Sequence, residues 1–231
     1  MSEVNWVSYR MTTMDDVYTE NDMNIFREPA RLIVAGFSHS GKTFLVSRLI
    51  RKYCEWFSKI YICGVKYHPL QDEESISPKI VVSEDVLDPL EDTNPSDKIL
   101  LVLDDMYLKA MRSPTVVDAF IKGRHSNLSV VMITQNLFMK GPYARDISLN
   151  ATHFILLRMR DLAQVECLMR QIYGKKHAAH VLEIYKRAVM NKPFGYLLLD
   201  MTIKTPPALK FRTNIANEPP CEVVYTHGEI T

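Results

Sequence analysis

Residues 36–43, GFSHSGKT, have the residue types and the spacing of a loop that binds phosphate groups. Gly36 and Gly41 let the backbone wrap with its N–H groups pointing inward, where they can hold a β-phosphate. Lys42 supplies a positive charge for the β- and γ-phosphate oxygens, and the Thr43 hydroxyl is suited to ligate Mg²⁺. The motif therefore predicts a nucleotide site, with ATP and Mg²⁺ as the expected ligands.

The residues around this loop supply the context that separates a phosphate loop from a chance glycine turn. The apolar run RLIVA, residues 31–35, predicts a buried strand directly before the loop. Residues 42–57 carry apolar side chains at helical spacing, so the loop opens a helix whose positive end favours anions. The predicted nucleotide-binding residues are Gly36, Ser38, His39, Ser40, Gly41, Lys42, Thr43 and Phe44.

A second candidate group is the run ILLVLDD, residues 99–105. A buried apolar strand that ends in two carboxylates is costly unless those charges have a task. We expect Asp104 to hold Mg²⁺, directly or through water, and Asp105 to polarise the attacking water. The alternative is an ordinary turn in which an aspartate caps the strand end.

A third candidate is Gln135, at the end of the run SVVMITQN, residues 129–136. In one large division of phosphate-loop enzymes, an additional strand lies between the two motif-bearing strands and ends in a polar residue near the γ-phosphate. Gln135 fits that position, because its strand follows the aspartate strand by one predicted helix. A polar strand-end turn without a catalytic role is the alternative.

The elements that must position these residues alternate between strands and helices, which predicts an α/β fold. We expect a three-layer, RecA-like P-loop NTPase of the additional-strand division, with a mostly parallel central sheet flanked by helices. Residues 161–174 and 175–190 predict two helices that meet at Gly174, and residues 194–201 and 209–215 predict a C-terminal strand pair. The expected divisions are an N-terminal arm (1–28), one ATPase domain (29–216) and a C-terminal tail (217–231).

Composition is that of a globular protein of 231 residues, 47% hydrophobic, with a net charge of +1. The four cysteines are widely spaced, which favours reduced thiols and an intracellular location. No run approaches the ~18 uncharged apolar residues that a membrane-spanning helix needs. Acidic residues concentrate in 71–97 and basic residues in 119–192, which indicates either a phosphate-facing surface or solvated helix faces.

Several segments together resemble the genome-packaging ATPases of double-jelly-roll DNA viruses and of Polinton/Maverick-type elements, members of the FtsK–HerA superfamily of DNA-pumping motors. These segments, between about residues 30 and 215, are GFSHSGKT, LLVLDD, GRHSNLSVVMITQNLF, ARDISLNATHFILLR and FRTNI. The resemblance implies a homo-oligomeric ring, a pentamer or a hexamer, that threads double-stranded DNA without sequence specificity into a capsid. It also implies a capsid vertex or other virion proteins as partners, inside the cytoplasm or nucleus of an infected cell or in the virion.

The resemblance further implies roles for individual residues. Lys42 and Thr43 match the phosphate-loop pair, Asp104 matches the Mg²⁺ carboxylate, and Gln135 matches the sensor. Asp105 stands where cellular relatives usually have glutamate as the catalytic base, which shortens the side chain by one methylene.

Ring motors of this class usually place an arginine of one subunit against the γ-phosphate of the next. Arg145 in ARDISLN is the first candidate for this arginine finger, and Arg124 in GRHSN is the second. Either could instead be a surface arginine.

Other functions remain open at this point. A helicase-like protein or a small-molecule kinase could use the same scaffold; the first would separate forked duplexes and the second would phosphorylate a small acceptor. A non-hydrolysing, nucleotide-gated assembly module would bind ATP tightly without releasing phosphate. The intact ILLVLDD strand argues against this third alternative.

Overall fold

The computed structural model describes residues 6–8, 23–90, 94, 96–190, 192–216 and 222–224. Most of the predicted N-terminal arm and C-terminal tail, including Cys221, lies outside the described residues. Among the described cysteines, Cys54, Cys63 and Cys167 carry free thiols. No helix in the described ranges is long and apolar enough to cross a membrane.

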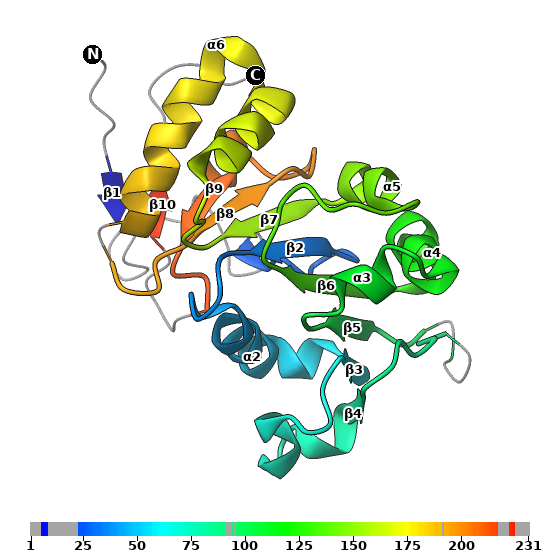
Figure 1. The fold of residues 1–231 in the computed structure, drawn as a ribbon. Helices are drawn as coiled ribbons and strands as arrows, with labels where there is room; N and C mark the ends of the chain where they lie inside the picture. Colours follow the sequence, from blue (N-terminus) through cyan, green and yellow to red (C-terminus); the bar gives the residue numbers. More distant parts are fainter. Residues whose placement is uncertain are drawn as a thin grey trace.

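The described strands form one ten-stranded sheet in the order β1-β10-β9-β8-β7-β2-β6-β5-β3-β4 (Figure 1). The strands are β1 (Trp6–Ser8), β2 (Arg31–Ala35), β3 (Lys59–Cys63), β4 (Ile80–Ser83), β5 (Ile99–Leu103), β6 (Leu128–Thr134), β7 (His153–Leu156), β8 (Leu197–Asp200), β9 (Phe211–Thr213) and β10 (Glu222–Val224). The run from β7 to β4 is parallel, and β8, β9, β10 and β1 add an antiparallel extension.

Strand β6 lies between β2 and β5, with Ile33 opposite Met132 and Val102 opposite Val131. This is the additional strand that the sequence predicted, inserted between the phosphate-loop strand and the aspartate strand. The predicted C-terminal pair is confirmed as well, because β8 and β9 are antiparallel neighbours. All residues of β5 and β6 are buried, as expected for central strands covered on both faces.

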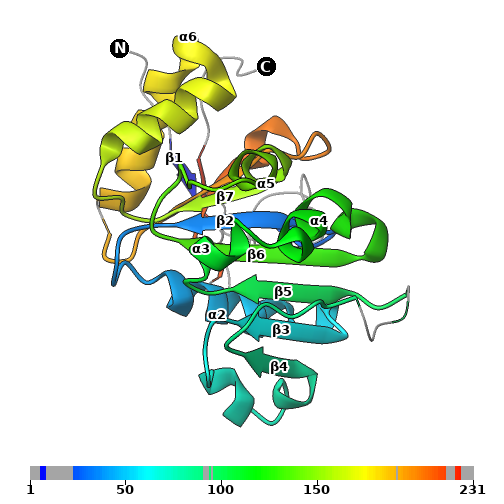
Figure 2. The same cartoon turned by 45° about the vertical axis from the view of Figure 1, so that its right-hand side comes forward.

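Helices cover both faces of this sheet, which confirms the three-layer α/β prediction. The helices are α2 (Lys42–Tyr53), α3 (Tyr107–Ala110), α4 (Pro114–Lys122), α5 (Ala144–Asn150) and α6 (Leu162–Met190). In Figure 2, α3 to α6 lie in front of the sheet and α2 lies behind it. Helix α6 is broken at Gly174, whose φ of 69° and ψ of 170° are not helical, so the two predicted helices meet at that glycine.

The apolar face of α2 packs behind the sheet through Leu45, Val46, Leu49 and Ile50. Phe26 joins the same cluster, and its ring meets the Phe57 ring edge-on with centroids 5.1 Å apart. The last residues of the predicted N-terminal arm therefore contribute to the core behind the sheet.

A buried ionic network joins β7, β8 and β9 at the end of the sheet where β7 begins. Arg212 Nη2 donates to Asp200 Oδ2 at 2.8 Å, and His153 Nε2 lies 3.5 Å from Asp200 Oδ1. The hydroxyl groups of Thr202 and Thr205 also donate to Asp200, at 2.6 and 2.9 Å. Arg212 belongs to FRTNI, one of the segments on which the family resemblance rests. In the structure this segment contributes a buried ion pair with Asp200.

Candidate nucleotide-binding site

The loop after β2 is held by backbone hydrogen bonds to the segments that end β6 and β7, the two strands that flank β2. Gly36 N donates to Thr134 O at 3.2 Å, and Phe37 N donates to Arg158 O at 2.9 Å. Gly36 is also required sterically, because a Cβ at this position would lie 2.6 Å from Ser40 Oγ. The carboxyl ends of β6 and β7 thus fix where the predicted phosphate loop lies.

The loop offers donors that suit a bound anion. Gly41 directly precedes helix α2, has a φ of 94° and gives no side-chain cap to the first turn. The N–H groups of a first helical turn have no acceptor within the helix, so they remain available to an anion. Ser40 Oγ is buried and, within the described part of the chain, has no hydrogen-bond partner. A triphosphate would satisfy these groups, and the loop therefore fits a nucleotide.

Lys42 lies across the loop, where Lys42 Nζ donates to Phe37 O at 3.0 Å. Burial lowers the pKa of Lys42, and the nearby charges of Asp105 and Asp104 oppose this shift. The ammonium therefore lies close to both carboxylates that follow β5.

Thr43 and Asp104 meet directly, because Thr43 Oγ1 donates to Asp104 Oδ2 at 2.9 Å. Asp104 is only 8% exposed, and this burial raises its pKa, although the Thr43 hydrogen bond opposes the rise. Two hard oxygen ligands side by side suit Mg²⁺, which is typically completed by phosphate oxygens and water. Nowhere in the described ranges do three or more His, Cys, Asp or Glu residues form a cluster suited to a metal.

Gln135 reaches the loop from the end of β6, where Ser38 Oγ lies 3.2 Å from Gln135 Oε1 and donates to it. Asp105 follows Asp104 at the end of β5 with an exposed side chain and a φ of 51°. A left-handed conformation is uncommon for a residue with a side chain, although aspartate adopts it more readily than most. Of the two adjacent carboxylates, Asp104 is buried against Thr43 and Asp105 is exposed.

Two side chains that the sequence did not single out support the contact between Thr43 and Asp104. The buried His68 accepts a hydrogen bond from Leu70 N at Nδ1 (3.3 Å), so the other ring nitrogen, Nε2, carries the hydrogen. His68 Nε2 then donates to Ser47 Oγ at 3.2 Å, and Ser47 Oγ donates to Thr43 O at 2.8 Å. Burial lowers the pKa of His68, which favours this neutral form. No local sequence signal marks His68, because it acts across 21 positions.

Gly64, directly after β3, supports the aspartate turn from the other side. It has a φ of 103°, and a Cβ at this position would lie 2.1 Å from Asp104 O. The Asp104 N–H also donates to Cys63 O at 2.9 Å. The end of β3 therefore holds the backbone of Asp104 in close contact.

The two candidate arginines lie on elements that precede strands β6 and β7. Arg124 belongs to a 3-10 helix, Gly123–Ser126, which precedes β6, whereas the phosphate loop meets the other end of β6. Seven residues of strand separate the ends of β6 by about 20 Å. Arg145 is exposed in the first turn of α5, and the last residue of that helix, Asn150, accepts a hydrogen bond from Arg31 at the start of β2.

His39 and Phe44, the remaining predicted loop residues, have exposed side chains. The Arg48 guanidinium lies over the Phe44 ring, 5.9 Å from its centroid.

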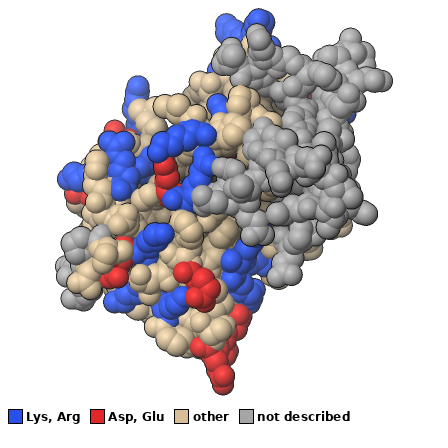
Figure 3. Space-filling model, turned by 180° about the vertical axis from the view of Figure 1, so that it is seen from behind, with Lys and Arg blue, Asp and Glu red and all other residues tan. Residues whose placement is uncertain are grey.

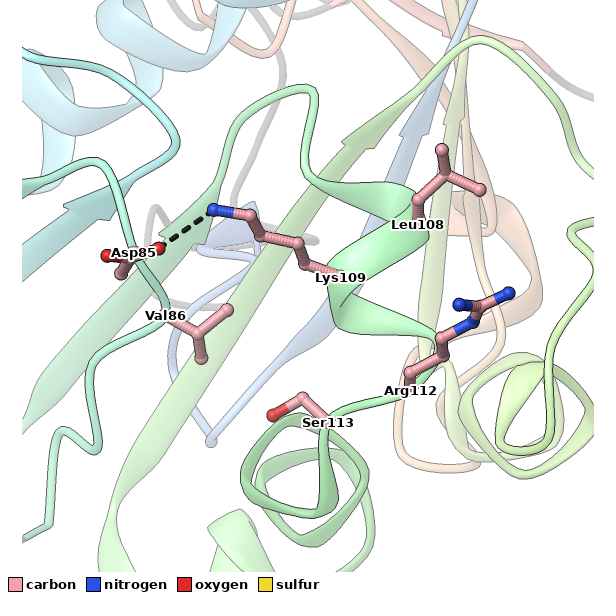
Figure 4. A pocket seen from close by; sticks show the side chains of 6 residues that line it. All are labelled: Asp85, Val86, Leu108, Lys109, Arg112 and Ser113. Carbon is pink, nitrogen blue, oxygen red and sulfur yellow. Dashed lines mark hydrogen bonds and ion pairs between the residues drawn. The ribbon is translucent and has the colours of Figure 1, made fainter.

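A cavity of about 550 Å³ lies next to the aspartate turn but does not contain it. It is lined by Asp85, Val86, Leu108, Lys109, Arg112 and Ser113. Lys109 Nζ donates to Asp85 Oδ1 at 2.8 Å across this cavity, while the Leu108 and Arg112 side chains point away from Asp85 (Figure 4). The candidate nucleotide site is therefore the loop itself and not this cavity.

Residues 68–202 match the sequence model of the family described as Poxvirus A32 protein, and this match covers more than half of the chain. The chain belongs to this family. The matched part of this family member begins after the phosphate loop and includes Asp104, Asp105, Gln135 and both candidate arginines. A relative described as DNA packaging protein OPG160, from Vaccinia virus (strain Copenhagen), is 22% identical over 197 residues. That alignment covers 77% of this chain and 72% of the vaccinia protein.

Solved structures with the same fold include the genome packaging NTPase B204 of Sulfolobus turreted icosahedral virus 2. The B204 complex with AMPPCP has a TM-score of 0.52 at 17% identity, over 75% of this chain and 93% of B204. The B204 complex with sulfate has a TM-score of 0.51 at 18% identity, over 75% and 92% of the two chains. At this level of identity the match establishes that this chain and B204 share a fold.

Proposed function

We propose that this protein is an ATP-driven motor that moves double-stranded DNA into a viral capsid. The observation that carries the ATP-hydrolysing part of the proposal is the 2.9 Å contact between Thr43 and Asp104, which brings the phosphate-loop helix and the aspartate strand together. The contact of Gln135 with Ser38 adds the intervening strand to the same point. Side chains that follow three separate strands thus meet at one loop, an arrangement suited to phosphoryl-transfer chemistry.

Support for DNA as the cargo comes from the family and not from the geometry. The chain belongs to the Poxvirus A32 protein family, and its vaccinia relative is described as a DNA packaging protein. A pump should grip backbone phosphates and read no base sequence, so the DNA interaction should be independent of sequence and weakened by salt.

Each residue of the site has a proposed task in ATP hydrolysis. Lys42 neutralises charge on the phosphate chain, and the first-turn N–H groups of α2 hold its oxygens. Thr43 and Asp104 would hold Mg²⁺, which when bound offsets charge on the phosphate oxygens. Asp105, the exposed member of the aspartate pair, accepts a proton from the attacking water, and Gln135 orients that water.

We further propose that the site is completed by an arginine from a neighbouring copy in a ring. Arg124 lies about one strand length from its own loop, and Arg145 is exposed on the surface of α5, so both side chains are accessible to a neighbouring subunit. Leu149 favours Arg145 for this role. It lies one turn from Arg145 on α5 and is 72% exposed, as an apolar side chain covered by a neighbouring subunit would be.

The basic segment 119–192 contributes fewer free charges than its sequence suggests. Lys122, Arg170 and Arg187 each pair with an acidic residue one helical turn away. On the face of the molecule that Figure 3 shows, Lys and Arg groups of the chain as a whole are interspersed with Asp and Glu groups. Lys175 and Lys176 are exposed and directly follow the break in α6, so they are the proposed DNA contacts of this segment.

The proposed partners are duplex DNA, other copies of the chain and a capsid vertex or other virion protein, inside an infected cell. The experiment that tests the function measures phosphate release with and without duplex DNA for the wild type, Lys42→Ala and Asp104→Asn. We expect stimulation by duplex DNA in the wild type and loss of hydrolysis in both variants. Full hydrolysis by Lys42→Ala would refute the proposal, and phosphate transfer to a small acceptor without DNA stimulation would indicate a kinase.

A further inference from the structure

Phe194, in the turn between α6 and β8, places an exposed aromatic ring against the phosphate loop. A Cβ built on Gly41 would lie 2.9 Å from Phe194 Cδ1, so the ring contacts the glycine that begins α2. Phe194 is nevertheless 67% exposed. Its φ of 55° lies in the left-handed region, which is an outlier for a bulky residue and persists only where the surroundings enforce it.

The turn that carries Phe194 is held firmly by its neighbours. Gly195 N donates to Lys192 O at 3.1 Å, and a Cβ at Gly195 would lie 2.5 Å from Ala188 O. Tyr196 is buried, and its hydroxyl accepts a hydrogen bond from Ala216 N at 3.2 Å. The position of the Phe194 ring is therefore set by the packing of α6 and β8, in spite of the backbone strain.

The strand order decides which end of a bound nucleotide would face Phe194. Asp104 and Gln135 follow β5 and β6, so the reacting end of the phosphate chain belongs on that side of β2. Strands β7 and β8 lie on the opposite side of β2, where Leu156 at the end of β7 pairs with Leu197 at the start of β8. Phe194 precedes Leu197 by three positions, so its ring lies on the side of β2 opposite to the reacting end of the phosphate chain.

We propose that Phe194 is the nucleoside contact of this site and stacks against the base of ATP. This inference rests on the proposed function, since it assumes that the loop binds ATP. A flat apolar ring offers a stacking surface to every base, so Phe194 would favour nucleotides over inorganic polyphosphates while discriminating weakly among bases.

Phe44 is the competing aromatic residue, because it is 62% exposed and follows Thr43 directly. The buried side of α2 faces the sheet through Leu45 and Leu49, whereas Phe44 lies beside Arg48 on the outer surface of the helix. Its ring therefore points away from the strands that flank the loop. Phe194, in contrast, contacts the loop itself.

The test measures equilibrium binding of ATP, GTP and inorganic tripolyphosphate to the full chain, in the presence of Mg²⁺. Stacking of a base on an aromatic ring typically contributes enough that its loss weakens binding by about 5- to 150-fold. We expect Phe194→Gly to weaken ATP and GTP binding by a factor in this range and to leave tripolyphosphate binding unchanged. Phe194→Trp should retain ATP binding, and its fluorescence should change with ATP but not with tripolyphosphate.

The glycine variant also separates binding from folding. Glycine adopts a positive φ without strain, so Phe194→Gly should retain the thermal midpoint of the wild type even though it binds ATP less well. Wild-type ATP affinity in Phe194→Gly, or an equal loss of ATP and tripolyphosphate binding, would overturn the inference and leave the proposed function intact. A selective loss of ATP affinity in Phe44→Ala but not in Phe194→Gly would assign the base contact to Phe44. Absence of ATP binding by the wild type would instead overturn the proposed function together with the inference.

Discussion

Replacing Gly64 by alanine tests whether the end of β3 holds the aspartate turn in place. The added Cβ would lie 2.1 Å from Asp104 O and 2.6 Å from Met106 Cγ, and the residue has a φ of 103°. Forcing a side chain into that backbone region costs about 1–3 kcal/mol. Overpacking typically adds about 1–3 kcal/mol, so we expect Gly64→Ala to lower the free energy of unfolding by roughly 2–6 kcal/mol in total.

Gly174→Ala is a matched control for this prediction. Gly174 also has a positive φ, 69°, but a Cβ there would meet no atom within 4 Å. The control therefore carries the backbone strain without the clash, and its expected cost is about 1–3 kcal/mol. Urea denaturation measures both costs. If Gly64→Ala were no more destabilising than Gly174→Ala, the close contact between β3 and the aspartate turn would be refuted.

The two glycine variants should also differ in activity. Displacement of the Asp104 backbone would break the contact between Thr43 and Asp104, so ATP hydrolysis should fall sharply in Gly64→Ala. Gly174→Ala lies in α6 and should retain the site. Equal hydrolysis by the two variants, measured where both are folded, would contradict the role of Gly64.

Three further predictions concern the buried ion pair, the support of the loop and the arginine finger. Burial raises the pKa of Asp200, but the hydrogen bond and charge of His153 and the charge of Arg212 outweigh burial and hold the pKa well below its usual range. Its stabilisation should therefore be complete above about pH 4 and be lost as the pH falls further. Asp200→Asn leaves the charge of the Arg212 side chain, which is 1% exposed, without its acidic partner. The substitution should lower the free energy of unfolding by about 3–5 kcal/mol at neutral pH, measured by urea denaturation, and should abolish this pH dependence. An unchanged pH profile in Asp200→Asn would contradict the stabilising role of the ion pair. Ser47→Ala should weaken Mg²⁺-dependent ATP binding by about 10-fold or more, because it removes the hydrogen bond to Thr43 O. The control Ser129→Ala, which removes a buried hydrogen bond from Ala30 N, should leave ATP binding unchanged. Equal ATP binding by the two variants would contradict the role of Ser47 in supporting the phosphate loop. Arg145→Ala and Lys42→Ala should each be inactive alone, but mixing the two proteins should restore ATP hydrolysis. At some interfaces of a mixed ring, the intact loop of an Arg145→Ala subunit then meets the intact arginine of a Lys42→Ala subunit. No recovery of hydrolysis would exclude Arg145 as the finger.

The parts of the site that the sequence predicted are those that depend on local patterns. A glycine-lysine-threonine loop between an apolar strand and an amphipathic helix is recognisable from adjacent residues, and the structure places that loop as expected. Asp104 and Gln135 could be proposed from the sequence because each follows or ends an apolar run, and parallel strands bring such ends to one edge of a sheet. The insertion of β6 between β2 and β5 then joins them to Thr43 and Ser38.

The supporting residues could not be predicted, because their roles arise from contacts between distant segments. His68 reaches the loop through Ser47, Gly64 is needed only because Asp104 O approaches it, and Phe194 meets Gly41 from the other end of the chain. The short helices α3 and α5 were also missed, since 4 and 7 residues are too few to establish a helical period. Arg145 and Arg124 were candidates from the sequence, and their positions on elements that precede β7 and β6 emerged only from the fold.

Displacement of a third strand from duplex DNA tests the central claim most directly, because it detects movement along DNA as well as ATP hydrolysis. A triplex-forming oligonucleotide is annealed to linear duplex DNA, and its release is followed after addition of the protein and ATP. We predict ATP-dependent release by the wild type, no release by Lys42→Ala, and no strand separation on a forked duplex. ATP hydrolysis by the wild type without release of the third strand would contradict a DNA-translocating motor.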